Sequence, residues 1–201
     1  DDGGTMRRRQ KMCRQYGVKH YNAVHWYPVV CVYDRYGWHT PQHLDKEYYA
    51  EFGNFDMQLT LPQQYIVGAT GLLINEDEVL PAALKKRLQL SNFKNKPLYE
   101  KPSVIIPEEK GVTKTWHFSA KDVHNFAFTA DPTYRISEVM LRGTKIQILA
   151  REPHAARWQE IPGLTALMMR LYSEQFGAYE YPSLVVADAQ DGTEYGMMAI
   201  V

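Results

Sequence analysis

The chain has 201 residues, 45% of them hydrophobic, which is enough apolar surface to bury a core and excludes an intrinsically disordered chain. Lysine plus arginine equals aspartate plus glutamate at 23 each, so no net field favours nucleic acid or an anionic membrane as a partner. No segment approaches the ~20 apolar residues of a membrane span, and the first residues, DDGGTMRRR, lack the apolar stretch of a secretion signal. We interpret the basic run at 7–11 as a solvated arm.

Two cysteines are too few for a disulfide framework, and the sequence leaves open whether Cys13 and Cys31 form a bridge. Cys31 lies in the apolar run YPVVCVY, which predicts a buried, unreactive thiol.

His39 and His43 have a spacing that suits zinc only on a helix, and Pro41 lies between them in a stretch of loop composition. We therefore interpret these histidines as surface or hydrogen-bonded side chains. His117 and His124 receive the same structural interpretation, because no ligand partner lies at a suitable spacing.

Aromatic residues gather in short runs between Gly, Pro and Asn, which predicts β structure over the first two thirds of the chain. At 55–61 apolar and polar residues alternate, as in a strand with one face on a core, and Pro62 ends that strand. A second strand is expected at 65–74. The polar stretch at 75–101 is interpreted as an insertion or loop with one short helix near 79–84.

Strands are expected again at 115–130 and 136–150, where Gly143 indicates a hairpin turn. Residues 154–176 then have helical periodicity, with Pro162 and Gly163 expected to kink or divide the helix and Gly177 to cap it. Five apolar residues share one face of this helix: Leu164, Leu167, Met168, Leu171 and Tyr172. Thr165, Arg170, Ser173 and Glu174 lie away from that face. A buried strand is expected at 181–189.

The chain closes with DGTEYGMMAIV, in which Glu194 stands between small and aromatic residues. A solvent-facing residue on a hairpin is one interpretation. The other is a carboxylate at the edge of a buried sheet, because Gly192 allows close approach of a ligand and Tyr195 offers an aromatic wall. Such a group suits an ammonium ligand. The apolar residues at 196–201 predict an edge strand with nothing to pair with, as in a site separated from its continuation.

Five motifs occur in a recognisable order: WYPVVCVYD with GW at 26–38, EYYAEFGNFDMQLTLPQQYIVGATG at 47–71, TWHFSAKDVHNFAFTADP at 115–132, SEQFGAYEYP at 173–182 and DGTEYGMM at 191–198. Together they resemble the aminopeptidase N-like zinc metallopeptidases, or gluzincins, and most of all the bacterial branch. The resemblance runs from about residue 14 onward, and residues 75–112 contribute little to it.

The resemblance implies a mainly β fold. A saddle-like β-sandwich N-terminal domain would occupy residues 1–150, and the first helix and strands of an incomplete thermolysin-like α/β catalytic domain would occupy 151–201. In the family, a Gly-x-Met-Glu-Asn motif lies on an edge strand, where its glutamate binds the free α-amine of the substrate and its backbone pairs with the peptide. Its five positions correspond to Asp191, Gly192, Thr193, Glu194 and Tyr195, so Gly192 to Tyr195 would be substrate-binding, with Glu194 as the amine anchor.

The resemblance further implies that the parent protein is a zinc-dependent metalloaminopeptidase, a hydrolase acting on peptides with a free N-terminus. The family takes its zinc from a His-Glu-x-x-His helix and a later glutamate, and this sequence contains no His-Glu pair. The chain alone is therefore expected to hold no catalytic residue and no zinc, to be inactive, and to need the rest of the catalytic domain as its partner. Relatives in this branch are often exported to the periplasm or cell envelope.

Two alternatives to a peptidase fragment stay open. The first is a non-catalytic β-sandwich interaction module that keeps the scaffold without the chemistry. The second is a degenerate peptidase homologue, because Asp191 and Thr193 depart from the Gly-Gly-Met-Glu-Tyr-Pro form of the motif that is common in the bacterial branch.

Overall fold

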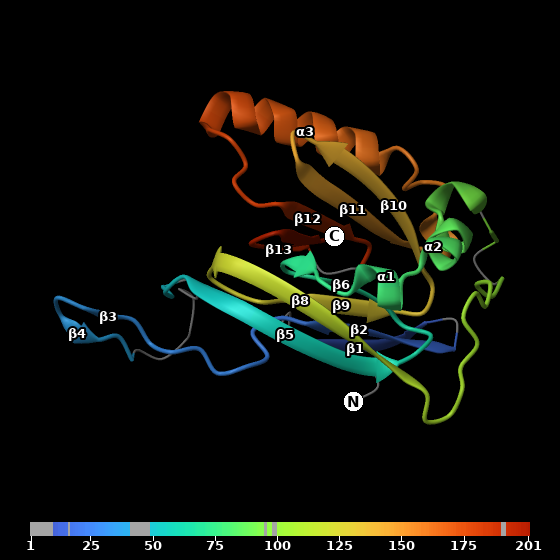
Figure 1. The fold of residues 1–201 in the computed structure, drawn as a ribbon, viewed down its shortest axis with the longest axis horizontal. Helices are drawn as coiled ribbons and strands as arrows, with labels where there is room; N and C mark the ends of the chain where they lie inside the picture. Colours follow the sequence, from blue (N-terminus) through green and yellow to red (C-terminus); the bar gives the residue numbers. More distant parts are fainter. Residues whose placement is uncertain (1–9, 16, 41–48, 95, 98–99, 190–191) are drawn as a thin grey trace.

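The computed structural model describes residues 10–15, 17–40, 49–94, 96–97, 100–189 and 192–201, with side chains described from residue 17 onward. The described chain is mainly β, as the sequence predicts. Figure 1 shows α3 on one side of a five-stranded sheet, with the strands of the other large sheets on the opposite side. No helix among the described residues is long and apolar enough to cross a bilayer.

Three larger sheets and one small hairpin make up the β structure of the described residues. The four-stranded antiparallel sheet has the order β1 (Gln10–Gln15), β2 (Val18–Ala23), β9 (Phe128–Asp131) and β6 (Ile66–Ala69). The three-stranded sheet has the order β5 (Gly53–Pro62), β8 (Thr113–Val123) and β7 (Leu72–Leu73). The five-stranded sheet has the order β10 (Tyr134–Leu141), β11 (Thr144–Arg151), β12 (Ser183–Ala187), β14 (Met198–Ile200) and β13 (Thr193–Tyr195).

The remaining elements are short, apart from one helix. They are the hairpin strands β3 (Tyr33–Asp34) and β4 (Gly37–Trp38), the helices α1 (Glu76–Val79), α2 (Ala82–Leu88) and α3 (Ile161–Phe176), and the 3-10 turns η1 (Leu90–Asn92) and η2 (Glu152–His154). The single short helix expected near 79–84 is thus two helices, because Pro81 separates them.

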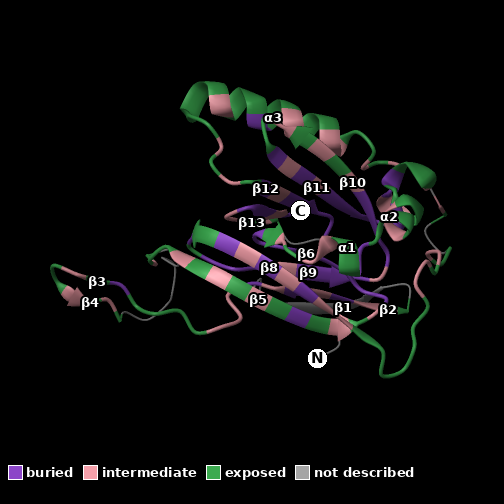
Figure 2. Cartoon of the chain, viewed as in Figure 1, coloured by how far each residue is buried: buried purple, intermediate pink, exposed green. Residues whose placement is uncertain are grey.

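Strand predictions that rest on local pattern are confirmed. In β5 the apolar side chains are buried or half-buried while Asp56, Gln58 and Thr60 are exposed, and Figure 2 shows this alternation along the strand. The hairpin of β10 and β11 also forms as expected. Its turn residues, Arg142 and Gly143, both have positive φ, at 48° and 89°, the backbone twist that two-residue hairpins favour.

The expected strand at 65–74 is instead divided between two sheets. β6 ends at Ala69, and β7 begins at Leu72 in the sheet of β5 and β8. Gly71 makes the change of direction with a φ of 102°, and a Cβ there would lie 2.6 Å from the carbonyl oxygen of Ser119. Only glycine therefore fits at this crossing.

All three large sheets contribute to one main core. Trp116 of β8, Ala130 of β9 and Met198 of β14 belong to the same buried cluster, and each is 0% exposed. Residue 150, the expected domain boundary, lies inside β11 and therefore within the five-stranded sheet. A division of the chain by sheets would fall between β9 and β10, at residues 132 and 133.

Helix α3 presents a face other than the one its periodicity suggests. The five apolar residues grouped in the sequence are 42–57% exposed. The side chain buried against the sheet is Met169, and it packs with Ile146 and Ile148 of β11. Thr165 and Ser173, expected on the outer side, are half-buried. Each lies four residues from Met169 and therefore on the same face of the helix. Pro162 lies in the first turn, where proline is tolerated, and the expected segment 154–176 is divided there without a kink in α3: residues 155–160 form turns, and the helix begins at Ile161.

Cys31 corrects another expectation, because it is an exposed free thiol. The run at 28–32 belongs to no strand and leads out to the hairpin of β3 and β4, so its apolar composition does not place Cys31 in a core.

Two glycine substitutions should shift stability in opposite directions. Gly71→Ala should destabilise the protein by about 2–4 kcal/mol, because the new methyl group meets backbone at a positive φ. Gly163→Ala, in α3 with no atom within 4 Å of the added Cβ, should stabilise it by about 0.5–1 kcal/mol. Urea denaturation midpoints measure both effects. An unchanged midpoint for Gly71→Ala would contradict the close approach to Ser119.

Candidate peptide-binding edge strand

The residues singled out at the end of the chain lie on β13, the last strand of the five-stranded sheet. Thr193, Glu194 and Tyr195 form this strand, and within the described residues it pairs only with β14. Gly192 precedes it with a φ of 64°, in the left-handed region that favours glycine. Asp191 lies outside the described residues. The edge position expected for Glu194 is therefore present in the fold.

The apolar tail is not itself the edge, contrary to the sequence-based expectation. β14 lies between β12, which it pairs with in parallel, and β13, which it pairs with antiparallel. Met198 and Ile200 are consequently buried. Gly196 and Met197 form the turn between β13 and β14, and Met197 has a φ of 64°. The chain thus folds back on itself, which leaves β13 as the outer strand.

The pleat of β13 separates Glu194 from its two neighbours. Glu194 is opposite Ala199, whose side chain packs with Val186 and Met169 on the side of the sheet that α3 covers. Tyr195 packs against the main core on the other side, and its ring lies 5.6 Å from the ring of His25. Because successive side chains alternate, the structure does not bring the Tyr195 ring and the Glu194 carboxylate together as a wall and an anchor.

Thr193 shares the core-facing side with Tyr195. The residue is half-buried, and its hydroxyl oxygen is buried without a hydrogen-bond partner among the residues that the structure describes. Thr193 and Tyr195 therefore seat the strand against the core, and what they present to the open edge is main chain.

The carboxylate of Glu194 is free to accept a cation. Glu194 is exposed, and within the described residues its side chain forms neither an ion pair nor a hydrogen bond. Glu138 at the other end of the same sheet differs, since its carboxylate lies 3.0 Å from the ammonium group of Lys145. Glu194 is thus an acidic group whose charge the described residues do not neutralise.

A buried polar network fixes the segment that leads into β13. Asp188, directly after β12, accepts hydrogen bonds from Arg151 Nη2 at 3.0 Å and from the Arg151 backbone N at 3.2 Å. His154 Nδ1 lies 2.6 Å from Asp188 Oδ2, the oxygen that also accepts from the Arg151 backbone N. One residue further on, the amide of Asn22 donates to the carbonyl of Ala189 at 2.9 Å. The residues that lead toward the hairpin of β13 and β14 are therefore held by hydrogen bonds from β11 and from β2.

The same network continues into the four-stranded sheet. Thr129 Oγ1 donates to Asn22 Oδ1 at 2.7 Å and lies 2.8 Å from the Tyr134 hydroxyl, which donates to the Asp188 carbonyl at 3.3 Å. His20 connects Asn22 to Asp131, at 2.9 Å on each ring nitrogen. Burial raises the pKa of the Tyr134 hydroxyl, so it acts here as a neutral donor. Sequence reasoning missed these residues because most partners lie far apart in the chain.

The carboxyl group of Asp188 has a lowered pKa in this network. Burial alone would raise the pKa of its carboxyl group, but hydrogen bonds from His154 and Arg151 and the positive charge of Arg151 outweigh burial and hold the pKa below its usual value. The ionised form is therefore the one that the folded protein stabilises.

The histidines considered for metal binding contact other partners. His39 Nε2 lies 2.9 Å from Asp34, His117 Nε2 lies 2.9 Å from Asp56, and His124 Nδ1 lies 3.0 Å from the Ala50 carbonyl. His43 lies outside the described residues. In the described part of the chain, no three His, Cys, Asp or Glu side chains converge.

Comparison with known proteins found no family model and no curated protein that matches the chain. The resemblance to aminopeptidases thus rests on the sequence motifs, and β13 is a candidate site because of its edge position and the exposed Glu194.

Acid should reveal the contribution of Asp188 to stability. Because its pKa is depressed in the folded state, the stabilisation is present above the unfolded pKa of about 3.9 and is lost as pH falls through the folded value. Asp188→Asn should lower the free energy of unfolding at pH 7 by about 1.5–3 kcal/mol, and its deficit should shrink below pH 4. Urea denaturation as a function of pH measures this.

Asp56→Asn is the matched control, since Asp56 is an exposed strand residue, and it should change stability by less than about 0.5 kcal/mol. A deficit for Asp188→Asn that stayed constant down to pH 2 would contradict the assignment.

Proposed function

We propose that this chain is the N-terminal part of a zinc-dependent metalloaminopeptidase, in which Glu194 anchors the α-amine of a peptide substrate. The observation that carries the proposal is an exposed carboxylate on the edge strand of a sheet, with no cationic partner in the described part of the chain, together with the motif it stands in. A peptidase that acts at a terminus has to distinguish an ammonium group from an internal amide. A carboxylate does so through a charge-assisted hydrogen bond, about twice as strong as a neutral one.

The main chain of β13 would supply the second part of recognition. An extended peptide can add to an open sheet edge through backbone hydrogen bonds, whatever its side chains. Gly192, Thr193 and Tyr195 would then contribute main-chain groups, because the side chains of Thr193 and Tyr195 face the core. This explains why threonine is compatible with the third position of the motif.

The layout of the sheets suits the proposed division of the molecule. The four-stranded and three-stranded sheets would form the saddle-like N-terminal domain, and the sheet of β10 to β14 with α3 would open the thermolysin-like catalytic domain. The exposed apolar face of α3, shown in green in Figure 2, would then be covered by the rest of that domain.

Zinc belongs to the proposed parent protein and not to this chain. The residues of the chain do not fit a zinc site, because the sequence lacks the His-Glu-x-x-His pattern and the described residues hold no converging set of ligands. Zinc in the parent would polarise the scissile carbonyl. Glu194 would place that carbonyl by fixing the amine one residue away.

Amine recognition can be measured on the 201-residue chain. Leucyl-leucine amide should shift the backbone NMR signals of residues 192–195, and N-acetyl-leucyl-leucine amide should not. Glu194→Gln should weaken binding of the free amine about tenfold or more, the usual scale for hydrogen bonds to a charge. Glu109→Gln, at an exposed loop carboxylate, is the control and should bind as the unmodified chain does. Equal shifts for the acetylated peptide would remove Glu194 from the proposed role.

The parent protein provides the decisive comparison. Codons after Val201 that specify His-Glu-x-x-His and a later glutamate would support the proposal, and the chain alone should hydrolyse no aminoacyl amide. A stop codon would favour the interaction module, and a substituted motif would favour the degenerate homologue.

A further inference from the structure

His20 is a buried histidine whose two ring nitrogens both face oxygen atoms. The residue lies in β2 and is only 2% exposed. Its Nδ1 lies 2.9 Å from Asp131 Oδ2 on β9, and its Nε2 lies 2.9 Å from Asn22 Oδ1 on its own strand. A neutral imidazole carries a proton on one nitrogen only, so one of these two contacts would join two acceptors. The charge of the ring therefore depends on whether Asn22 or Asp131 can offer a donor instead.

The amide group of Asn22 cannot be turned to offer that donor. In its present orientation the Asn22 amide nitrogen, Nδ2, donates to the carbonyl oxygen of Ala189 at 2.9 Å. Turning the amide would place two buried oxygen atoms, Asn22 Oδ1 and the Ala189 carbonyl, against each other without a proton between them. The hydroxyl group of Thr129, 2.7 Å from Asn22 Oδ1, suits either orientation because it can donate or accept. Asn22 Oδ1 therefore faces His20, and His20 Nε2 has to carry a proton.

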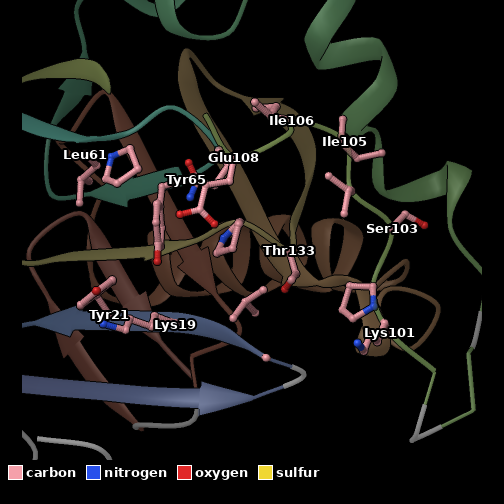
Figure 3. Close-up of a pocket in the computed structure, with 17 residues that line it drawn as sticks. Lys19, Tyr21, Leu61, Tyr65, Lys101, Ser103, Ile105, Ile106, Glu108 and Thr133 are labelled. Carbon is pink, nitrogen blue, oxygen red and sulfur yellow. The ribbon is translucent and has the colours of Figure 1, made fainter. Parts of the chain in front are cut away.

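Asp131 keeps the second proton on the ring of His20. Its other oxygen, Oδ1, accepts hydrogen bonds from the backbone N and the hydroxyl group of Thr133, both at 2.6 Å, which favours the ionised carboxylate. An ionised Asp131 requires a proton on His20 Nδ1. Thr133 also lines the hollow that Figure 3 shows beside β2, whereas His20 and Asp131 do not line it. Solvent in that hollow therefore does not screen the contact between His20 and Asp131.

The charges around His20 balance when its ring is a cation. Asp131 and Asp188 are both buried, and Arg151 donates to Asp188 at 3.0 Å and is also attracted by Asp131. Among the described residues of this cluster, one buried arginine thus faces two buried carboxylates. Buried charges are paired as a rule, and a charged His20 supplies the second positive charge.

The other titratable groups near the ring leave this balance in place. The Tyr134 ring of β10 meets His20 edge-on, at 5.9 Å between ring centroids, and its hydroxyl group is neutral because burial raises its pKa. The side chain of His154 contacts Asp188 but is 28% exposed, so water can compensate its charge. Cys13 of β1 is opposite His20 in the strand register. Asp131 is therefore the charged group that the described side chains place in direct contact with the ring.

We propose that His20 is a positioning residue for the hairpin of β13 and β14 and acts as a buried cation with a proton on both ring nitrogens. The Nε2 proton holds Asn22 Oδ1, which leaves the Asn22 amide to donate to Ala189. The N–H of Ala189 in turn donates to the Val201 carbonyl at 2.8 Å, just beyond β14. Loss of the Nε2 proton frees the amide to turn toward the ring, and the Ala189 carbonyl then loses its donor. The inference concerns how the hairpin is held, so it does not depend on the peptidase proposal.

The protons on His20 can be counted in the unmodified 201-residue chain, labelled with nitrogen-15 histidine. At pH 7, long-range proton–nitrogen NMR spectra should show both ring nitrogens of His20 protonated, with the ring signals assigned through bonds from its backbone. A histidine that serves packing alone would carry one ring proton, and that result would overturn the proposal.

Asp131→Asn tests the link between the ring and the hairpin. The substitution removes the anion, so the His20 ring should lose one proton at pH 7, and the backbone signals of Ala189 and of residues 192–195 should shift with it. Asp56→Asn is the matched control, because Asp56 makes an exposed contact of the same length, 2.9 Å, with His117, and it should leave those signals in place. Two protons retained on His20 in Asp131→Asn would contradict the proposal, and so would a neutral ring with an unmoved Ala189 signal.

Raising the pH of the unmodified chain makes the same comparison without a substitution, which covers the case in which Asp131→Asn does not fold. The Ala189 signal should shift in step with the loss of the His20 Nε2 proton. A proton lost from His20 without that shift would overturn the positioning role.

Discussion

The structure depends on the buried polar network that joins two sheets behind the candidate site. Asp188, Arg151 and Tyr134 belong to the five-stranded sheet or the residues next to it, and Asn22 and Thr129 belong to the four-stranded sheet. Hydrogen bonds are directional, so this network fixes how the sheets lie relative to each other more narrowly than apolar contact does. Removing one partner and leaving the other buried and unsatisfied typically costs about 1–3 kcal/mol. The position of β13 follows from this anchoring of residues 188 and 189.

Once the sheet is placed, the pleat decides which groups of β13 are available. Consecutive side chains of a strand point to opposite faces of the sheet. Tyr195 faces the core and Glu194 faces away from it, so the two side chains cannot line the same pocket. The same principle explains why the edge keeps an uncompensated charge. Glu194 lies on the side of the sheet where Ala199 and Val186 are its neighbours across the strands, and neither has a polar group to offer.

Sequence reasoning succeeded where the determinant is local and failed where it lies across the fold. The alternation in β5 and the turn at Arg142 and Gly143 are properties of consecutive residues. The face of α3 could not be predicted in this way, because periodicity finds an apolar stripe but not the neighbour it meets, and β11 meets Met169. For the site, glycine and apolar flanks left two interpretations of Glu194 open, and the structure has it exposed on the edge strand of a hairpin, which is consistent with both. The order of β13 and β14 depends on pairing with a remote segment, β12.

The Glu194 carboxylate and the exposed apolar face of α3 lie on the same side of the five-stranded sheet. The Glu194 side chain faces the same side as α3, and the outer face of α3 is itself apolar and exposed. Under the proposed function, one further body of protein approaching from that side would cover Leu167 and Leu171 and also bound the space beside Glu194. Covering apolar surface would then lower the local dielectric around the carboxylate and strengthen its attraction for an ammonium group. Completion of the fold and the selectivity for a free amine would in this way depend on the same contact.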